Sequence, residues 1–304
     1  MSTTLLSIIN HNTQLLTRLP YTFISVQGDD AEKFLQGQLS CDLSLLNGQN
    51  LSFGTLNSPK GRMCALFKIT AYKNGFLLRI ESSTTELFLL TLTKYKVFFK
   101  CEISIEEQFS AFAYNADAKT ELPLPQNTKD LMSIDTNFIS RLSNNAPLYE
   151  IWSQEINDQK TKISTDTESW FALEAKLGIP ELYAETQDQF ILQYLNLQDL
   201  GAVSFKKGCY TGQEIIARMK FLGKLKKKMF LLSASDKYTV QPGADVFSDE
   251  GKKCGTVVRS HWSEQTGSVT LAILSTSYIG NQASVYFDEH KTLPFQVKEL
   301  NYTS

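Results

Sequence analysis

KKGCYTGQE, residues 206–214, is the stretch around which the rest of the chain is organised. Gly208 and Gly212 stand on either side of Cys209, and glycine can adopt positive φ and lets the backbone come close to a ligand or another segment. From Gly212 onward the apolar residues recur at helical spacing. We therefore predict that Cys209 lies in a tight loop at the start of a helix.

This loop favours a reactive thiol at Cys209. The unpaired N–H groups and the dipole of a helix start stabilise a thiolate, and Lys206 and Lys207 add positive charge. The alternative is that Cys209 is a small buried apolar residue, which is the more common role of a free cysteine. The residue pattern by itself leaves both open.

KGCYTGQE, followed by Ala217-Arg218, resembles the motif of the YgfZ family, the folate-binding relatives of the glycine-cleavage T-protein. The similarity extends over residues 196–223, and a second block, GDDAEKFLQGQLSCD at residues 28–42, resembles the first conserved block of the same superfamily. Two separate matches make a chance resemblance improbable.

The pattern of the chain predicts an α+β fold. Expected strands and helices alternate without the regular order of a doubly wound sheet, and frequent turns after about residue 225 are typical of a small antiparallel barrel. The resemblance likewise implies T-protein-like mixed sheets with a C-terminal β-barrel. We predict an N-terminal folate-binding part at residues 1–117, a second part carrying the motif at 118–224, and a barrel domain at 225–304, with a loop or weak structure at about residues 118–145.

The resemblance also implies a site for tetrahydrofolate or a derivative. Tyr21 and Trp170 fall where the family has aromatic residues implicated in folate contact, although Tyr21 replaces a tryptophan, and ordinary core packing is the alternative for both. Cys209 is the expected functional thiol. Its loop is expected to be supported by the other motif residues, Lys207, Gly208, Tyr210, Gly212, Gln213, Glu214 and Arg218. Glu214 and Arg218 are four residues apart, so they could form an ion pair on a helix.

The family role is the upkeep of iron–sulfur enzymes, including those that thiomethylate tRNA. We therefore expect a folate-binding accessory protein whose partners include iron–sulfur proteins such as a tRNA methylthiotransferase. One alternative is a folate-dependent aminomethyl transferase, and another is a non-catalytic interaction module. T-proteins carry acidic residues after the glycine turn that matches Lys60-Gly61, whereas this chain has Cys64 and Ala65. Whether the chain is an enzyme is therefore left open.

Composition limits the remaining possibilities. The net charge of -2 argues against general nucleic-acid binding, and the five scattered cysteines argue against disulfides, zinc or a self-contained iron–sulfur cluster. We expect a cytoplasmic protein without signal peptide or membrane span, which the family resemblance suggests is a monomer. A basic run at Lys220, Lys224 and residues 226–228 is either a solvated face or a contact for a folate polyglutamate tail or RNA phosphate.

Overall fold

The computed structural model describes residues 16–116, 124–128, 130–134, 136–144, 146–156, 163–221, 225–278, 284–288 and 290–302. The chain forms two compact units. The first unit comprises residues 1–54 and 67–167 with residue 304, and the second comprises residues 55–66 and 168–303. Among the described residues no helix is long and apolar enough to cross a membrane.

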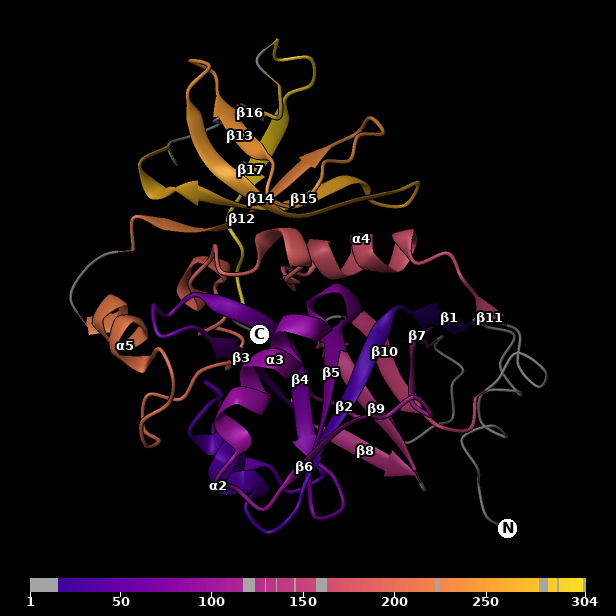
Figure 1. Ribbon diagram of the computed structural model, residues 1–304. Coiled ribbons are helices and arrows are strands. Elements are labelled where there is room, and N and C mark those ends of the chain that lie inside the picture. Colours follow the sequence, from indigo (N-terminus) through magenta and orange to yellow (C-terminus); the bar gives the residue numbers. More distant parts are fainter. Residues whose placement is uncertain are drawn as a thin grey trace. The chain divides into compact units, whose positions relative to one another are not determined.

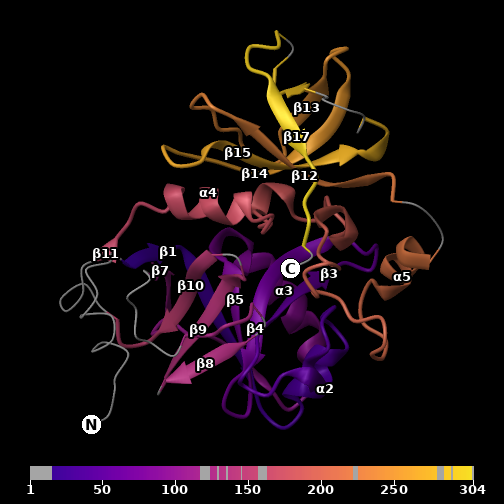
Figure 2. The same ribbon diagram turned by 180° about the vertical axis from the view of Figure 1, so that it is seen from behind.

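Two β-sheets build the first unit, although residues 55–57 and 63–66 of the second sheet fall in the second unit (Figures 1 and 2). One sheet has the strand order β11-β1-β7-β10-β9-β8, and the other has the order β3-β4-β5-β2-β6. The strands of the first sheet are β1 (Leu16–Leu19), β7 (Ser110–Asn115), β8 (Leu131–Ile134), β9 (Asn137–Ser143), β10 (Ala146–Ser153) and β11 (Ile163–Ser164). Those of the second sheet are β2 (Tyr21–Gln27), β3 (Ser52–Asn57), β4 (Met63–Ala71), β5 (Gly75–Glu81) and β6 (Glu102–Ile105).

Helices connect the strands of the second sheet. They are α2 (Ala31–Gln36), α3 (Thr85–Lys96) and the short 3-10 helices η1 (Leu43–Leu45) and η2 (Ser82–Thr84). In α2, Phe34 and Leu35 are buried, and in α3 the buried side chains are Phe88 and Leu92, four residues apart on one face. Each helix thus buries one apolar face, as the sequence pattern predicts.

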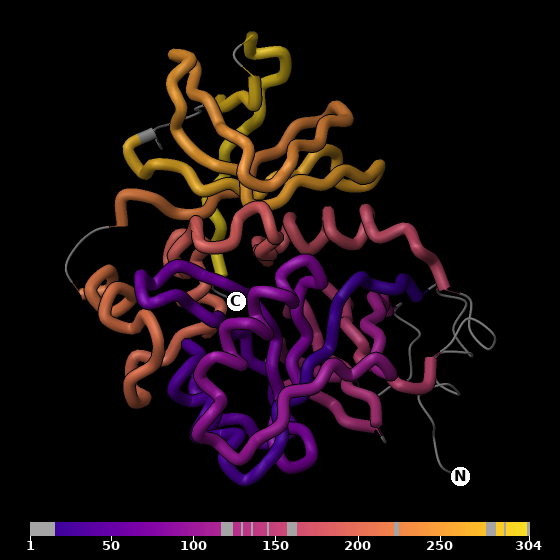
Figure 3. The backbone as a smooth tube through the Cα atoms, viewed as in Figure 1, coloured from indigo at the N-terminus to yellow at the C-terminus, as the bar shows by residue number. Residues whose placement is uncertain are grey.

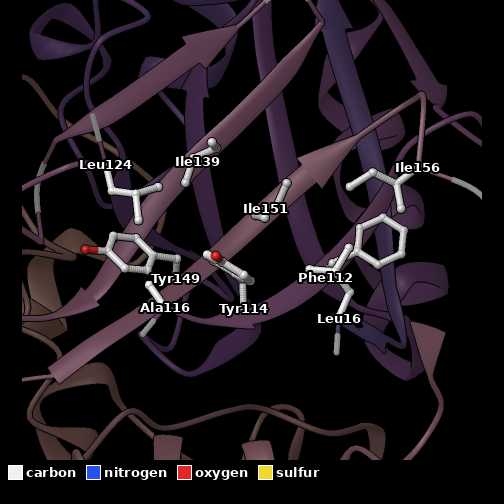
Figure 4. Close-up of a cluster of buried hydrophobic side chains, with 9 residues drawn as sticks. All are labelled: Leu16, Phe112, Tyr114, Ala116, Leu124, Ile139, Tyr149, Ile151 and Ile156. Carbon is white, nitrogen blue, oxygen red and sulfur yellow. The ribbon is translucent and has the colours of Figure 1, made fainter. Parts of the chain in front are cut away.

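Strand β10 shows how the two sheets of the first unit share a core. Successive side chains of a strand point to opposite faces, and here Tyr149 and Ile151 join an apolar cluster on one face (Figure 4). On the other face, Trp152 meets Phe23 of β2 with ring centroids 5.3 Å apart. Aromatic packing therefore ties the two sheets together.

A buried charge cluster lies on the same face of β10 as Trp152. The carboxylate of Glu150 is 2.6 Å from Lys68 Nζ and 3.0 Å from Arg79 Nε, and all three side chains are almost fully buried. The indole Nε1 of Trp152 donates a hydrogen bond of 2.6 Å to the same carboxylate. A buried carboxylate needs such partners, since an unpaired one would be strongly destabilising.

The second unit contains a closed β-barrel with the strand order β12-β15-β14-β13-β16-β17. Figure 3 shows the chain of these strands winding around the barrel, in orange to yellow. The strands are β12 (Lys227–Ala234), β13 (Asp245–Ser248), β14 (Lys253–Ser263), β15 (Gly267–Ser275), β16 (Ser284–Tyr286) and β17 (Phe295–Lys298). Closure leaves no unpaired sheet edge and encloses an apolar interior that includes Phe230 and Phe295.

Helices and 3-10 helices complete the second unit. They are α4 (Glu168–Lys176), η3 (Ala184–Thr186), η4 (Leu192–Leu195), α5 (Gln213–Phe221) and η5 (Thr276–Tyr278). Helix α4 lies along β14 of the barrel (Figure 1), where Arg259 Nη1 is 3.2 Å from Glu174 Oε2 and both side chains are buried. Gly178, at φ +77°, follows the helix and ends it as expected.

The prediction of a loop at residues 118–145 is wrong for part of that range. Strands β8 and β9 lie there, and β9 pairs with β10 in antiparallel register, with Ile139 opposite Ile151. The polar composition hid strands that are stabilised by pairing in a sheet, β8 with β9 and β9 with the next strand β10, rather than by their own propensity. Residues 118–123 lie outside the described part of the chain. The division into three parts at residues 117 and 224 stays a prediction.

Candidate functional site

Two glycine turns pack against each other in the second unit and hold the KGCYTGQE loop. Gly212 has φ +82°, and a Cβ atom there would lie 2.7 Å from the carbonyl oxygen of Ser58. Gly61, in the facing turn, has φ +70°, and its Cβ would lie 2.9 Å from Cβ of Ile215. The facing turn is closed by a 2.8 Å hydrogen bond from Gly61 N–H to Ser58 C=O. Only glycine combines this conformation with this closeness.

Gly212→Ala should destabilise the protein by at least about 2 kcal/mol, because it adds backbone strain and a clash with Ser58. Gly208→Ala is the matched control. Contrary to the sequence interpretation, Gly208 does not have positive φ and has open space where a Cβ would be. Chemical denaturation of both variants measures the difference. Equal stability of the two variants would contradict the assigned role of Gly212.

Cys209 is exposed, four residues before α5 begins at Gln213. The neighbouring Tyr210 is buried, the Nζ of Lys207 lies 5.3 Å from its ring centroid, and its carbonyl accepts a 3.1 Å hydrogen bond from Gln213 N–H. Tyr210 and Gly212 therefore anchor the loop and leave the thiol of Cys209 at the surface. The alternative of a buried structural cysteine does not agree with this exposure.

The other cysteines lie in different surroundings. Cys41, Cys64 and Cys254 are buried, and Cys101 is half-buried. Burial raises the pKa of Cys64 to about 11, with Asp188 adding to the effect, and burial raises the pKa of Cys254 to about 11. Burial also raises the pKa of Cys101. The thiols of Cys64, Cys101 and Cys254 are therefore poor nucleophiles near neutral pH.

Helix α5 follows the loop and presents a mixed surface. Ile216 is buried, and its carbonyl accepts a 2.6 Å hydrogen bond from the buried amide Nε2 of Gln193. Glu214 and Arg218 are both exposed, and within the described residues no ion pair joins them. At an exposed position such a pair would contribute little, since water solvates both charges.

Trp170 lies in the first turn of α4 and is 5% exposed. Its indole Nε1 is buried and has no hydrogen-bond partner in the part of the chain that the structure describes. Buried donors are normally satisfied, so this N–H is suited to an acceptor that the described residues do not supply. A folate ligand offers such acceptors on its pterin and amide groups.

Tyr21 lies in the first unit, whereas Trp170 and Cys209 lie in the second. The guanidinium carbon of Arg79 is 3.7 Å from the centroid of the Tyr21 ring. This cation–π contact occupies one face of the ring. At most one face of the Tyr21 ring is therefore left for a flat ligand. A tryptophan with both faces free would be better suited to stacking.

A pocket of about 380 Å³ in the second unit was not foreseen from the sequence. Its lining includes Arg62, Asp188, Tyr194 and Lys227. The Oδ1 atom of Asp188 accepts a 2.8 Å hydrogen bond from Ser58 Oγ, which links the pocket to the paired glycine turns. The sequence contained only a slight indication of this pocket, namely Arg62, the basic residue after Lys60-Gly61.

Among the described residues no group of His, Cys, Asp and Glu side chains could hold a metal ion.

No protein-family model matches the chain. A relative from Hamiltonella defensa named tRNA-modifying protein YgfZ is 30% identical over 250 residues, which is 75% of this chain and 74% of the relative. A protein of the same name from Colwellia psychrerythraea is 29% identical over 283 residues, which is 86% of this chain and 87% of the relative.

A solved structure also matches. It is the glycine cleavage system aminomethyltransferase T from Bartonella henselae, with a TM-score of 0.68, 16% sequence identity, and coverage of 98% of this chain and 89% of that chain. At this identity the likeness concerns the fold, and it confirms the predicted T-protein-like α+β fold with its C-terminal barrel. The two sequence relatives, which share most of their length with this chain, show that it belongs to the YgfZ family.

Proposed function

We propose that this protein binds tetrahydrofolate or a derivative and supports tRNA modification by maintaining iron–sulfur enzymes, among them a tRNA methylthiotransferase. The observation that carries the proposal is the exposed thiol of Cys209 in a loop that two packed glycine turns hold in place. The names of the sequence relatives, tRNA-modifying proteins, support the link to tRNA. We place this activity in the cytoplasm.

Trp170 is the residue proposed to hold the folate. Its buried, unsatisfied Nε1–H fits an acceptor on that ligand, whereas the ring of Tyr21 is partly covered by Arg79. Folate, when bound, would supply a carrier for one-carbon units. Cys209 would act on a partner protein or its cluster as an exposed nucleophile or ligand.

Aminomethyl transfer is the less favoured function. At the positions where T-proteins have acidic residues, Cys64 and Ala65 lie in β4 and are buried. The pKa of Cys64 is raised to about 11, first by burial. Its thiol therefore stays protonated near neutral pH and cannot replace a carboxylate as a base.

Trp170→Phe should weaken tetrahydrofolate binding about tenfold, because it keeps an aromatic ring and removes only the Nε1–H donor. Fluorescence or calorimetric titration measures the dissociation constant. Trp262→Phe, on β14 of the barrel, is the control and should leave binding unchanged. Identical titration curves for wild type, Trp170→Phe and Trp170→Ala would sink the assignment of Trp170.

A non-catalytic interaction module without a working folate site is the other alternative. A ligand that binds the folded state raises the melting temperature. If saturating tetrahydrofolate leaves the melting temperature of the wild-type protein unchanged, this alternative replaces the proposal.

A further inference from the structure

A groove of about 580 Å³ lies beside the C-terminal half of α5, away from the paired glycine turns. Its apolar lining comes from the loop after η4 and from α5, and polar side chains complete it. The lining residues are Val203, Phe205, Met219, Leu225, Gln198, Asp199 and Lys220. Neither the exposed thiol nor Trp170 is among these residues, so the groove is separate from the site described above.

The ring of Phe205 lines this groove, and the ring of Phe221 lies beside it. Phe221, the last residue of α5, is 71% exposed, and its ring centroid is 6.2 Å from that of Phe205. The Nζ of Lys220 lies 3.7 Å from the Phe205 centroid and 5.6 Å from that of Phe221. An exposed aromatic ring with a cation held beside it offers a flat stacking surface next to a positive charge.

The surrounding sequence is strongly basic, although the whole chain has a net charge of -2. Between residues 206 and 228 the described part of the chain has a single acidic residue, Glu214. The described basic residues in that range are Lys206, Lys207, Arg218, Lys220, Lys226, Lys227 and Lys228. Lys228 pairs with Glu299 at 3.3 Å, but Lys206, Arg218 and Lys220 are exposed around the groove's helix and loop. The positive charge is therefore local and available to an anionic partner.

We propose that this groove and its lysines bind a single-stranded segment of RNA, with a base stacked on Phe221 and the phosphates next to Lys220 and Lys206. The combination of a ring face and nearby cations matches the repeating base and phosphate of a single strand. A duplex keeps its bases stacked inside, where they cannot reach the rings. A polyglutamate chain would use the lysines but has no flat group to place on Phe221.

The inference rests on the proposed function, because a tRNA-modification role supplies an RNA partner. The inference goes beyond that function because it assigns direct RNA contact to this chain. The net charge of the whole chain gave no reason to expect such contact. Local charge decides this case: Asp199 also lines the groove, but the cations around the groove's helix and loop outnumber it, and acidic residues more than about 10 Å away are screened by salt.

Fluorescence anisotropy with a labelled oligouridine of about 12 nucleotides tests the proposal on the full chain. We expect the wild type to bind, Phe221→Ala to bind about tenfold more weakly, and Lys220→Gln to reduce the salt dependence by about 0.7 in log–log slope. The control is Phe98→Ala, since Phe98 is 93% exposed and stands close in sequence to Lys96 and Lys100, but it belongs to the first unit, whereas Phe221 contacts the groove residue Phe205. It should leave the affinity unchanged.

Three results would overturn the inference. They are no binding by the wild type, equal losses in Phe221→Ala and Phe98→Ala, and equally tight binding of polyglutamate, which would show that the lysines bind an acidic chain, such as a folate polyglutamate tail or an acidic protein segment, and not RNA in particular. Tetrahydrofolate titration of Phe221→Ala separates this inference from the proposed function. A wild-type protein that binds folate but not oligouridine contradicts the RNA groove alone, and one that binds RNA but not folate contradicts the proposed function.

Discussion

Glu150→Gln is expected to lower the free energy of unfolding by about 3–5 kcal/mol, because it leaves two buried cations without their counter-charge. Lys68 and Arg79 are each 3% exposed and contact the two oxygens of the Glu150 carboxylate. Glutamine keeps the size and can still accept the hydrogen bond from Trp152 through its oxygen, but its NH2 group then faces Lys68 Nζ, so the loss combines the missing charge with one lost acceptor. Urea denaturation measures the effect.

Two further variants test this prediction, one as a control and one as a partial rescue. Glu107→Gln removes a carboxylate that is exposed in the same unit, and it should change stability by less than about 0.5 kcal/mol. Adding Lys68→Met to Glu150→Gln removes one of the uncompensated charges and should recover part of the loss, because the two residues interact directly. A loss below about 1 kcal/mol in Glu150→Gln would contradict the role given to this cluster.

The same carboxylate predicts a pH dependence. Burial tends to raise the pKa of Glu150, but the charges of Arg79 and Lys68 outweigh it and lower the pKa to about 2. A group whose pKa is lower in the folded state stabilises the protein above its unfolded pKa, here about 4.3, and this stabilisation is lost as the pH falls toward 2. Glu150→Gln should therefore lose less stability than the wild type between about pH 4.5 and pH 2.

Cys209 should be the first cysteine to react with iodoacetamide near pH 7. It is exposed, whereas Cys64 and Cys254 are buried with pKa values raised to about 11. At pH 7 a thiol with such a pKa is ionised in only about one molecule in ten thousand, so both should label at least a hundredfold more slowly. Peptide mapping by mass spectrometry measures each site.

Cys101, half-buried, is the internal comparison for that experiment. It should label more slowly than Cys209 but faster than Cys64, and unfolding in urea should make all five cysteines react alike. Labelling of Cys64 or Cys254 as fast as Cys209 in the native protein would contradict the exposure and burial on which the proposed thiol depends.

Local pattern was enough to predict several elements of the fold. The frequent turns after about residue 225 indicated a β-barrel, whose strands run from Lys227 to Lys298, and the helical spacing after Gly212 indicated a helix, found as α5. Strands β8 and β9 were missed, because β8 is stabilised by pairing with β9 and β9 by pairing with β10, and their polar residues do not show this pairing.

The candidate site was only partly predictable for a similar reason. The sequence marked Gly212 as a tight turn, but nothing in it revealed that the turn packs on Ser58 and Gly61, more than a hundred residues away. Nor could it distinguish Gly208, which has open space, from Gly212. The buried cluster of Lys68, Arg79 and Glu150 was likewise hidden, since a strand sequence does not show which charges will face each other across two sheets.

Complementation tests the proposed function most directly. A strain lacking the gene should show reduced activity of several iron–sulfur enzymes and reduced thiomethylation of tRNA, and the wild-type protein should restore both. Cys209→Ser, which preserves the size of an exposed side chain, should fold normally and fail to restore them, while Cys101→Ser should restore them fully. Full restoration by Cys209→Ser would contradict the proposal, because it would show that the protein works without this thiol.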